Sequence, residues 1–388
     1  MAITTSRREF LSAGLMLPVA GAASNLNFLD SPDKPGAKLS KTPRLDYRVL
    51  GNTGLKVTTV GFGCMITSDP TVVTRAADIG INYFDTARGY QNGNNERMVS
   101  AALGAKRKDL VLSTKSIANN KDGLLKHLDT SLSELKTDYV DIWYLHSKDT
   151  PVAIHDDMIE AQQIAKQQGK IRFAGMSTHA LPKMTEWTID KKAFDVVLTV
   201  YNFTMDQKAD EAIAAVAQTG TGVVAMKVMA GGAHARRPGD KVDPRMEQEG
   251  AMLAALKWVL HKPNIATTIP SMTDMDQLDD NLRAMAETYS PADEKILTAQ
   301  LDRIASMYCR FCGECDGACA KGLQIADTLR VLTYADGYGQ FALARERFNE
   351  LPAHHATARC ADCTECTVKC PHGVHIAERI ARAQELFA

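Results

Sequence analysis

Eight short runs rich in valine, isoleucine and aromatic residues alternate with segments of helical periodicity, and this alternation constrains the fold more than any other feature. A strand followed by a helix, repeated eight times, predicts parallel strands joined by crossover helices. Eight such units favour a closed (β/α)8 TIM barrel over an open sheet. The runs are TTVGFG (58–63), INYFD (81–85), DLVLST (109–114), YVDIWYLH (139–146), IRFAGMS (171–177), FDVVLTVY (194–201), TGVVAMK (221–227) and IATTIP (265–270).

Two further patterns complete the predicted architecture. LDYRVLGNTGLKV (45–57), ahead of the first run, predicts a β-hairpin about Asn52–Gly54. Behind the barrel, residues 301–388 hold eight of the nine cysteines. We therefore expect an α/β barrel over residues 44–300 and a small, α-helical, ferredoxin-like domain over residues 301–388.

The eight cysteines form two runs with one spacing, CRFCGECDGAC (309–319) and CADCTECTVKC (360–370). Disulfide scaffolds are mostly short chains in oxidising compartments, and zinc usually takes two separated C-x2-C pairs. Four thiolates spaced C-x2-C-x2-C-x3-C favour a cubane 4Fe–4S cluster. Zinc and disulfides remain alternatives. The ninth cysteine, Cys64, lies in a glycine-flanked apolar stretch and is expected to be a small buried residue.

The two runs resemble those of two-cluster ferredoxins, in which the fourth cysteine of each run ligates the other cluster. Pro371 follows the second run as in the bacterial pattern, whereas Ala320 stands where the first run would have its proline. The resemblance implies two 4Fe–4S clusters. Their ligands would be Cys309, Cys312, Cys315 and Cys370 for one, and Cys360, Cys363, Cys366 and Cys319 for the other.

The N-terminus has the pattern of an export signal. Arg7 and Arg8 precede a short apolar segment, LSAGLMLPVAGAA (11–23), that ends in small residues. This resembles a twin-arginine signal peptide; a chance arginine pair before a helix is the alternative. We expect a signal over residues 1–23, a flexible lead-in over residues 24–43, the twin-arginine export machinery as a partner and a periplasmic or otherwise exported location.

Charge and hydropathy exclude two other classes of partner. The formal net charge is −1, 23% of residues are charged and no basic cluster stands out, so a nucleic-acid surface is not expected. No apolar run in the mature chain reaches the length of a transmembrane helix, so no membrane span is expected there.

Polar residues stand at three successive strand ends of the predicted barrel, where chemistry is located in this fold. They are Asp85, Lys115 and His146, with Tyr90 in the loop after Asp85. Each alone has an ordinary structural explanation: a helix cap, a solvated lysine, a locally bonded histidine or a packed ring. Together they supply what carbonyl reduction needs, because a buried cation lowers the pKa of a nearby tyrosine from about 10.

The segments FDTARGY, VLSTK and DIWYLH resemble the signature segments of the aldo-keto reductases, and NNERMVSAAL resembles the helix after the tyrosine. The similarity extends from about Leu50 to Asn281. It implies Tyr90 as proton donor to the carbonyl oxygen, Lys115 and His146 as the groups that tune it, and Asp85 as the anchor of Lys115. The cysteine runs resemble the ferredoxin-like tail of an iron–sulfur subgroup of this family.

The resemblance also implies an NAD(P)(H) site, though with departures from the usual pattern. The expected glutamine is Leu198, and the usual stacking tyrosine falls near Met226 or Lys227. Ser271 and Gln277 replace the usual cations at the adenine end, where Asp274 and Asp276 would repel a 2′-phosphate. The selectivity between NAD and NADP stays open. The cofactor-binding residues implied are Ser177, Asn202, Lys227, Ser271, Gln277 and Asn281.

The combined expectation is an exported iron–sulfur oxidoreductase that interconverts a small aldehyde or ketone with an alcohol. The clusters either pass electrons to a transfer partner or only fasten the tail to the barrel. An electron-transfer or binding protein with a catalytically silent barrel is the alternative function. The loop 231–248, with His234, Arg236 and Arg237, could contact an anionic or sugar-like substrate or simply be solvated.

Overall fold

The computed structural model describes residues 44–232, 243–246 and 248–388 of the 388-residue chain. The predicted signal peptide and lead-in lie outside these described residues, and so do His234, Arg236 and Arg237. The strands are β1 (Tyr47–Val49), β2 (Lys56–Thr58), β3 (Phe62–Gly63), β4 (Tyr83–Asp85), β5 (Val111–Ser116), β6 (Val140–Leu145), β7 (Ile171–Thr178), β8 (Val196–Val200), β9 (Gly222–Met226) and β10 (Thr267–Thr268).

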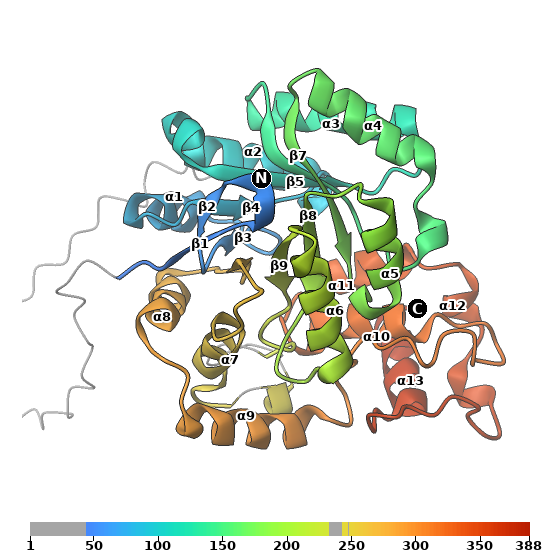
Figure 1. Ribbon diagram of the computed structural model, residues 1–388. Helices are drawn as coiled ribbons and strands as arrows, with labels where there is room; N and C mark the ends of the chain where they lie inside the picture. Colours follow the sequence, from blue (N-terminus) through green and yellow to red (C-terminus); the bar gives the residue numbers. More distant parts are fainter. Residues whose placement is uncertain (1–43, 233–242, 247) are drawn as a thin grey trace, which may run out of the picture. The chain divides into compact units, whose positions relative to one another are not determined.

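Helices surround the strands and continue beyond them to the C-terminus (Figure 1). The α-helices are α1 (Pro70–Ile79), α2 (Asn94–Leu103), α3 (Lys121–Leu135), α4 (Asp156–Gln167), α5 (Leu181–Lys191), α6 (Gln207–Gln218), α7 (Ala251–Leu260), α8 (Met275–Ala286), α9 (Pro291–Ile304), α10 (Ile325–Asp336), α11 (Phe341–Asn349), α12 (His354–Thr357) and α13 (Ile376–Phe387). None of these helices is long and apolar enough to cross a membrane.

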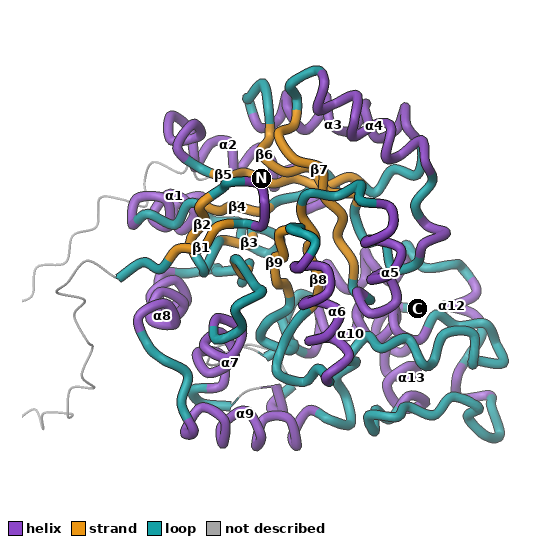
Figure 2. The backbone as a smooth tube through the Cα atoms, viewed as in Figure 1, coloured by secondary structure: helices purple, strands orange, loops and turns teal. Residues whose placement is uncertain are grey.

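Strands β3 to β10 form one parallel sheet in sequence order, and each overlaps one of the eight predicted apolar runs. Two parallel bridges, Val60 to Thr268 and Gly63 to Ser271, join the first and last members and close the sheet. Figure 2 shows the strands enclosed by helices. The predicted (β/α)8 TIM barrel is therefore confirmed.

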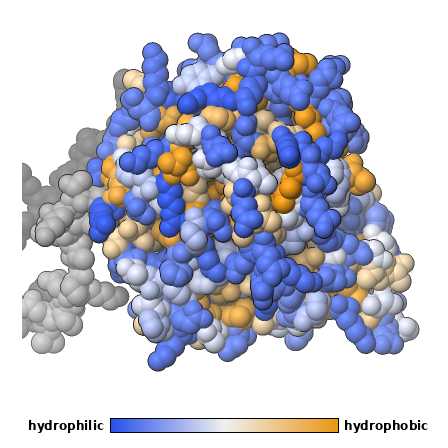
Figure 3. Space-filling view, viewed as in Figure 1, coloured by the Kyte–Doolittle hydropathy of each residue, from blue (hydrophilic) through white to orange (hydrophobic). Residues whose placement is uncertain are grey.

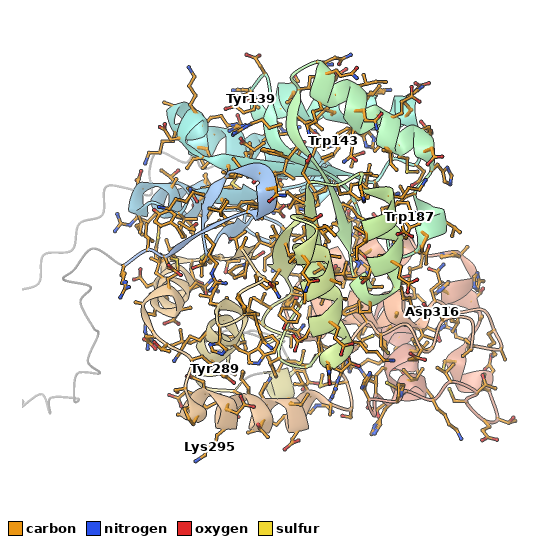
Figure 4. All side chains as sticks on the ribbon, viewed as in Figure 1. Tyr139, Trp143, Trp187, Tyr289, Lys295 and Asp316 are labelled. Atoms are coloured by element: carbon orange, nitrogen blue, oxygen red, sulfur yellow. The ribbon has the colours of Figure 1, made fainter. Side chains whose placement is uncertain are left out.

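The apolar faces of the surrounding helices pack against the outside of the barrel strands. Trp143 of β6, labelled in Figure 4, is fully buried in this layer, together with Leu124 and Leu128 of α3. On the viewed face of the molecule, hydrophilic side chains predominate and hydrophobic areas are small and separate (Figure 3).

The predicted hairpin forms from β1 and β2 and fills one end of the barrel. Gly54 turns the chain with a φ of 72°, a conformation that glycine adopts without strain. Leu50 and Val57 are fully buried in the cluster of side chains that fills the barrel interior, which also holds Leu198. Because the hairpin contacts the start of β9 through the Asn52 to Gly220 backbone hydrogen bond, it covers the N-terminal ends of the strands.

The C-terminal helices pack on the barrel and on one another; they are drawn in orange and red in Figure 1. Buried Asp336 at the end of α10 pairs with Arg379 and Arg382 of α13, each at 2.7 Å. Asp316, labelled in Figure 4, pairs with Lys183 of α5 at 2.6 Å. The described residues of the barrel and of the C-terminal segment belong to one compact unit.

Candidate active site

The carboxyl ends of neighbouring parallel strands bring the four predicted catalytic residues together. Asp85 is the last residue of β4, Lys115 lies near the end of β5, and His146 directly follows β6. Tyr90 begins the short 3-10 turn Tyr90–Gly93 after β4. Because β4, β5 and β6 pair in parallel, these side chains share one rim of the barrel.

Lys115 is the centre of the hydrogen bonding at this rim. Its ammonium forms an ion pair with Asp85 and donates to the Thr86 carbonyl at 2.8 Å and to the Tyr90 hydroxyl at 3.4 Å. Lys115 and Asp85 are each only 1% exposed. Ser113 donates to the other carboxylate oxygen of Asp85 at 2.6 Å, so both ends of the ion pair are held in place.

Tyr90 and His146 lie against each other, with ring centroids 5.9 Å apart and planes at 78°. The Nδ1 atom of His146 is buried and has no hydrogen-bond partner among the described residues. Burial, and then the charge of Lys115, hold the pKa of His146 well below its usual value. The imidazole is therefore neutral at neutral pH and can exchange hydrogen bonds with a bound carbonyl compound.

The pKa of Tyr90 differs in sign from the sequence prediction. Burial raises it above the ordinary value of about 10, and Lys115 opposes that rise without cancelling it. Burial also disfavours the charged form of Lys115, but its interactions with Asp85 and Tyr90 prevail and raise the pKa of its ammonium. The pKa of Tyr90 is higher than predicted because burial removes the hydroxyl from water, which the sequence does not reveal. Tyr90 is therefore protonated at neutral pH.

A cavity of about 950 Å³ opens above the rim, and Asp85, Tyr90 and His146 line it. Residues of β7, of the segment after β9 and of the loop between β10 and α8 form further parts of its wall. The segment between β3 and α1 also lines it, and the C-terminal segment contributes through α10, α11 and the connection between them. A cavity of this size accommodates a small-molecule cofactor and a substrate.

Comparisons with known proteins agree with this geometry. Residues 68–252 match the model of the family described as "Aldo/keto reductase family". The chain is 28% identical to "Uncharacterized oxidoreductase YqkF" of Bacillus subtilis, over 61% of this chain and 90% of that protein. It is 26% identical to "L-galactose dehydrogenase" of Arabidopsis thaliana, over 67% of this chain and 94% of that protein.

A solved structure extends the agreement to the fold. The holo form of the aldo-keto reductase AKR11C1 from Bacillus halodurans aligns with a TM-score of 0.56 and 25% identity, covering 66% of this chain and 96% of that one. The barrel is similar to that of the aldo/keto reductases. The predicted enzyme class, an NAD(P)-dependent oxidoreductase, is confirmed with it.

Four of the six residues that the resemblance assigned to the cofactor line the cavity of this barrel: Ser177, Lys227, Ser271 and Gln277. The hydroxyl of Ser177 accepts a hydrogen bond from the Ser147 backbone at 2.9 Å. The side chain of Gln277 accepts one from the Thr273 backbone at 2.9 Å. Both side-chain contacts are with backbone amides. A ligand would therefore meet uncharged, polar side chains at Ser177 and Gln277.

The other two cofactor candidates differ from each other. Asn202 is fully buried, and its amide bonds the Lys227 carbonyl, the Tyr308 hydroxyl and Thr204, so it joins barrel loops to the C-terminal segment. Asn281 is 1% exposed, and neither its Oδ1 nor its Nδ2 has a partner among the described residues. A buried amide of this kind normally has partners. Asn281 therefore fits a role in binding a polar ligand such as the cofactor's adenine.

The C-terminal segment contributes charged and phenolic residues to the wall of the catalytic cavity that were not predicted from the sequence. Among them are Arg330 and Tyr334 of α10 and Arg347 of α11. Arg347 donates to the carbonyl of Gly89, directly before Tyr90, at 3.0 Å. The sequence does show that Arg330 and Tyr334 are four residues apart and so lie on one face of a helix. It does not show that this face packs against the barrel.

The cysteines of the two runs gather beside one hydrophobic cluster. Cys309 belongs to it, and Cys315, Cys319, Cys360, Cys366 and Cys370 pack against it. None of the nine cysteines, which all lie within the described residues, forms a disulfide bond. Among the described residues, no three histidine, cysteine or acidic side chains could hold a single metal ion.

Proposed function

We propose that the chain is an exported iron–sulfur aldo/keto reductase that interconverts an aldehyde or ketone with an alcohol. The observation that carries the catalytic part is the position of the Tyr90 hydroxyl. It lies on the cavity wall, 3.4 Å from an ammonium that Asp85 and the Thr86 carbonyl hold in place. A protonated phenol in this position can donate to a carbonyl oxygen bound in the cavity.

The nicotinamide, when bound, supplies the hydride to the carbonyl carbon. Tyr90 donates its hydroxyl proton to the carbonyl oxygen as negative charge develops there. The ammonium of Lys115 stabilises the resulting phenolate, and Asp85 keeps that ammonium charged and oriented. The neutral His146 donates a hydrogen bond to the same oxygen and orients the substrate. Ser177, Gln277 and Asn281 would hold the cofactor.

Two 4Fe–4S clusters in the C-terminal segment are the iron–sulfur part of the proposal. Burial, followed by the charges of Cys315, Cys312 and Cys370, raises the pKa of Cys309 to about 12. Burial, followed by Cys366, Cys363 and Cys319, raises the pKa of Cys360. The cysteines that interact with Cys309 and with Cys360 are those of the two ligand sets implied by the ferredoxin resemblance. In each set the fourth cysteine comes from the other run. The absence of a single-ion site among the described residues does not oppose a cubane, whose four irons each take one cysteine.

Export through the twin-arginine route is proposed from Arg7, Arg8 and the apolar segment after them. The route carries folded proteins, which is compatible with clusters inserted before export. Exchange of both arginines for lysine should leave the folded protein inside the cell, as judged by cell fractionation. Unchanged export of that variant would contradict the assignment.

Replacement of Tyr90 by phenylalanine tests the catalytic proposal. The variant keeps the ring against His146 and removes only the hydroxyl, so binding of NADH and NADPH should be nearly unchanged. Reduction of a panel of aldehydes should fall by about 10²–10⁴-fold, the usual contribution of general acid catalysis. Full activity in Tyr90→Phe would remove Tyr90 as the acid. No activity in the parent protein would favour the alternative, an electron-transfer or binding protein with a silent barrel.

A further inference from the structure

Two cations, Lys227 and Arg330, lie on either side of one phenol in the wall of the catalytic cavity. Lys227 follows β9, and its ammonium donates to the Tyr334 hydroxyl at 3.3 Å and lies 4.7 Å from the centre of the Tyr334 ring. Arg330, one helical turn before Tyr334, donates to the same hydroxyl at 3.4 Å. Lys227, Arg330 and Tyr334 all line the cavity that holds Tyr90.

The charges of this group are incompletely balanced. Arg330 pairs with Asp327 at 2.7 Å. Among the described residues no carboxylate forms an ion pair with Lys227, whose partner is the phenol oxygen. Both hydrogen bonds to that oxygen are near the long limit for such contacts. Lys227 is half-buried, and an ammonium partly removed from water without an ion-paired carboxylate is costly, so the site favours an additional anion.

The group lies beside the reacting centre. Arg347 and Arg330 both contribute to the depressed pKa of His146, and Tyr334 contributes to the raised pKa of Tyr90. All of these residues line the same cavity of about 950 Å³, so an anion held by Lys227 and Arg330 and a carbonyl group at Tyr90 can belong to one molecule. The third cation, Arg347, is already occupied by Glu350 at 2.6 Å and by the Gly89 carbonyl.

We propose that Lys227 and Arg330 recognise a carboxylate or phosphate group on the carbonyl substrate, and that Tyr334 occupies the space between them until this anion binds. The inference rests on the proposed function of the cavity and adds the substrate class, an aldehyde or ketone that carries an acidic group. The recognition site is shared between the barrel and the C-terminal segment.

The surroundings of Tyr334 predict how the site depends on pH. Burial by itself would raise the pKa of Tyr334, but Lys227 and Arg330 outweigh it and lower the pKa to about 7. Arg347 of α11 and the phenols Tyr90, Tyr308 and Tyr338 also interact with Tyr334. Below that pKa the phenol is neutral and the cations are free to bind an anion. Above it, the phenolate competes, so affinity for an anion should fall.

A binding experiment tests the site without turnover. Malonate or inorganic phosphate is added to the full chain slightly above pH 7 at constant ionic strength, with chloride as the control salt. Tyrosinate absorbance in the near ultraviolet should decrease, because a bound anion raises the pKa of Tyr334. Tyr334→Phe should show no such change. An unchanged spectrum in the parent protein at every anion concentration would refute the site.

A matched pair of aldehydes tests the substrate class. Succinic semialdehyde and butanal have the same carbon chain, and only the first carries a carboxylate. Lys227→Met and Arg330→Met should each lower kcat/KM for succinic semialdehyde by roughly tenfold to a hundredfold, the range for a hydrogen bond to a charged group. Butanal reduction should fall by much less, so the ratio of the two kcat/KM values is the readout, and Arg330→Lys should recover part of the loss. Arg97→Met, at an exposed ion pair on α2, is the control.

The remaining outcomes separate the two proposals. Equal losses for both aldehydes in Lys227→Met and Arg330→Met would overturn the inference and assign the two cations to maintenance of the fold. Loss of NADH and NADPH affinity in these variants would also overturn it and assign the cations to the cofactor's phosphates. Circular dichroism and thermal melting identify a variant that has not folded. If the parent reduces neither aldehyde, the proposed function fails for this class, and the spectroscopic experiment still decides whether an anion binds.

Discussion

The chemistry of single residues in this barrel depends on neighbours that are remote in sequence. Tyr90 and Tyr334 are both buried phenols in one cavity, yet the pKa of Tyr90 is raised and that of Tyr334 is lowered to about 7. Tyr90 has one cation near it, and Asp85 offsets that charge. Tyr334 lies between two cations. Tyr90 is therefore suited to donate a proton at neutral pH. The protonation of Tyr334, in contrast, depends on the charges placed near it.

The ion pair of Lys115 and Asp85 allows its structural and catalytic roles to be separated. Lys115→Met should destabilise the fold by about 3–5 kcal/mol, the usual cost of leaving one buried charge unpaired. Adding Asp85→Asn removes that charge and should recover much of the free energy of unfolding, measured with urea. Aldehyde reduction should stay at least a hundredfold low in both variants, because the pKa of Tyr90 rises further without the ammonium. Recovery of activity along with stability would limit Lys115 to a structural role.

At the scale of elements, the strands were predictable and the C-terminal wall of the cavity was not. Each barrel strand has an apolar run bounded by turn residues, and catalytic side chains in this fold follow strand ends, so local pattern was sufficient. The buried face of α3 includes Leu124, Leu128 and Leu132. Tyr334 contacts Lys227 across 107 residues of sequence. No local pattern specifies such a contact.

The start of α8 should decide between the two nicotinamide cofactors. Asp274 caps this helix by accepting from the Gln277 backbone at 2.9 Å, and Asp276 is exposed in its first turn. With Ser271 and Gln277 as the neutral residues on the cavity wall, a 2′-phosphate would meet the carboxylates of Asp274 and Asp276 in place of the usual cations. NADH should therefore bind more tightly than NADPH, as measured by fluorescence titration.

A pair of substitutions supplies the missing cations. Ser271→Lys combined with Gln277→Arg should tighten NADPH binding by roughly tenfold or more, the value of a charge-assisted hydrogen bond, and leave NADH affinity nearly constant. Ser271→Thr combined with Gln277→Asn is the uncharged control. Equal gains in affinity for NADH and NADPH would mean that the new charges act on the pyrophosphate or through the overall electrostatic potential of the site. The 2′-phosphate would then bind elsewhere.

For the molecule as a whole, the cysteine runs and the catalytic cavity are parts of one arrangement. Helices α10 and α11, which carry Arg330, Tyr334 and Arg347 into the cavity, lie in sequence between Cys319 and Cys360. Clusters that bind cysteines from both runs would close this segment into a loop and restrict its motion. We expect cluster loss to impair the cavity wall for that reason, even if no electron passes between the two sites.

In the proposed arrangement, the fourth cysteine of each run ligates the cluster of the other run. Double variants test this arrangement, because their iron losses add only when the two cysteines ligate different clusters. The intact protein, purified without oxygen, should hold about eight irons, and Cys319→Ala and Cys312→Ala should each lose about half. Cys319 is proposed to share a cluster with Cys360, so Cys319→Ala with Cys360→Ala should lose no more than either single variant. Cys319→Ala with Cys312→Ala should lose nearly all iron, because each change removes a different cluster. Cys64→Ala, within the barrel core, is the control and should keep the full content. The reverse pattern, with Cys319 and Cys312 behaving as one site, would mean that each run binds its own cluster.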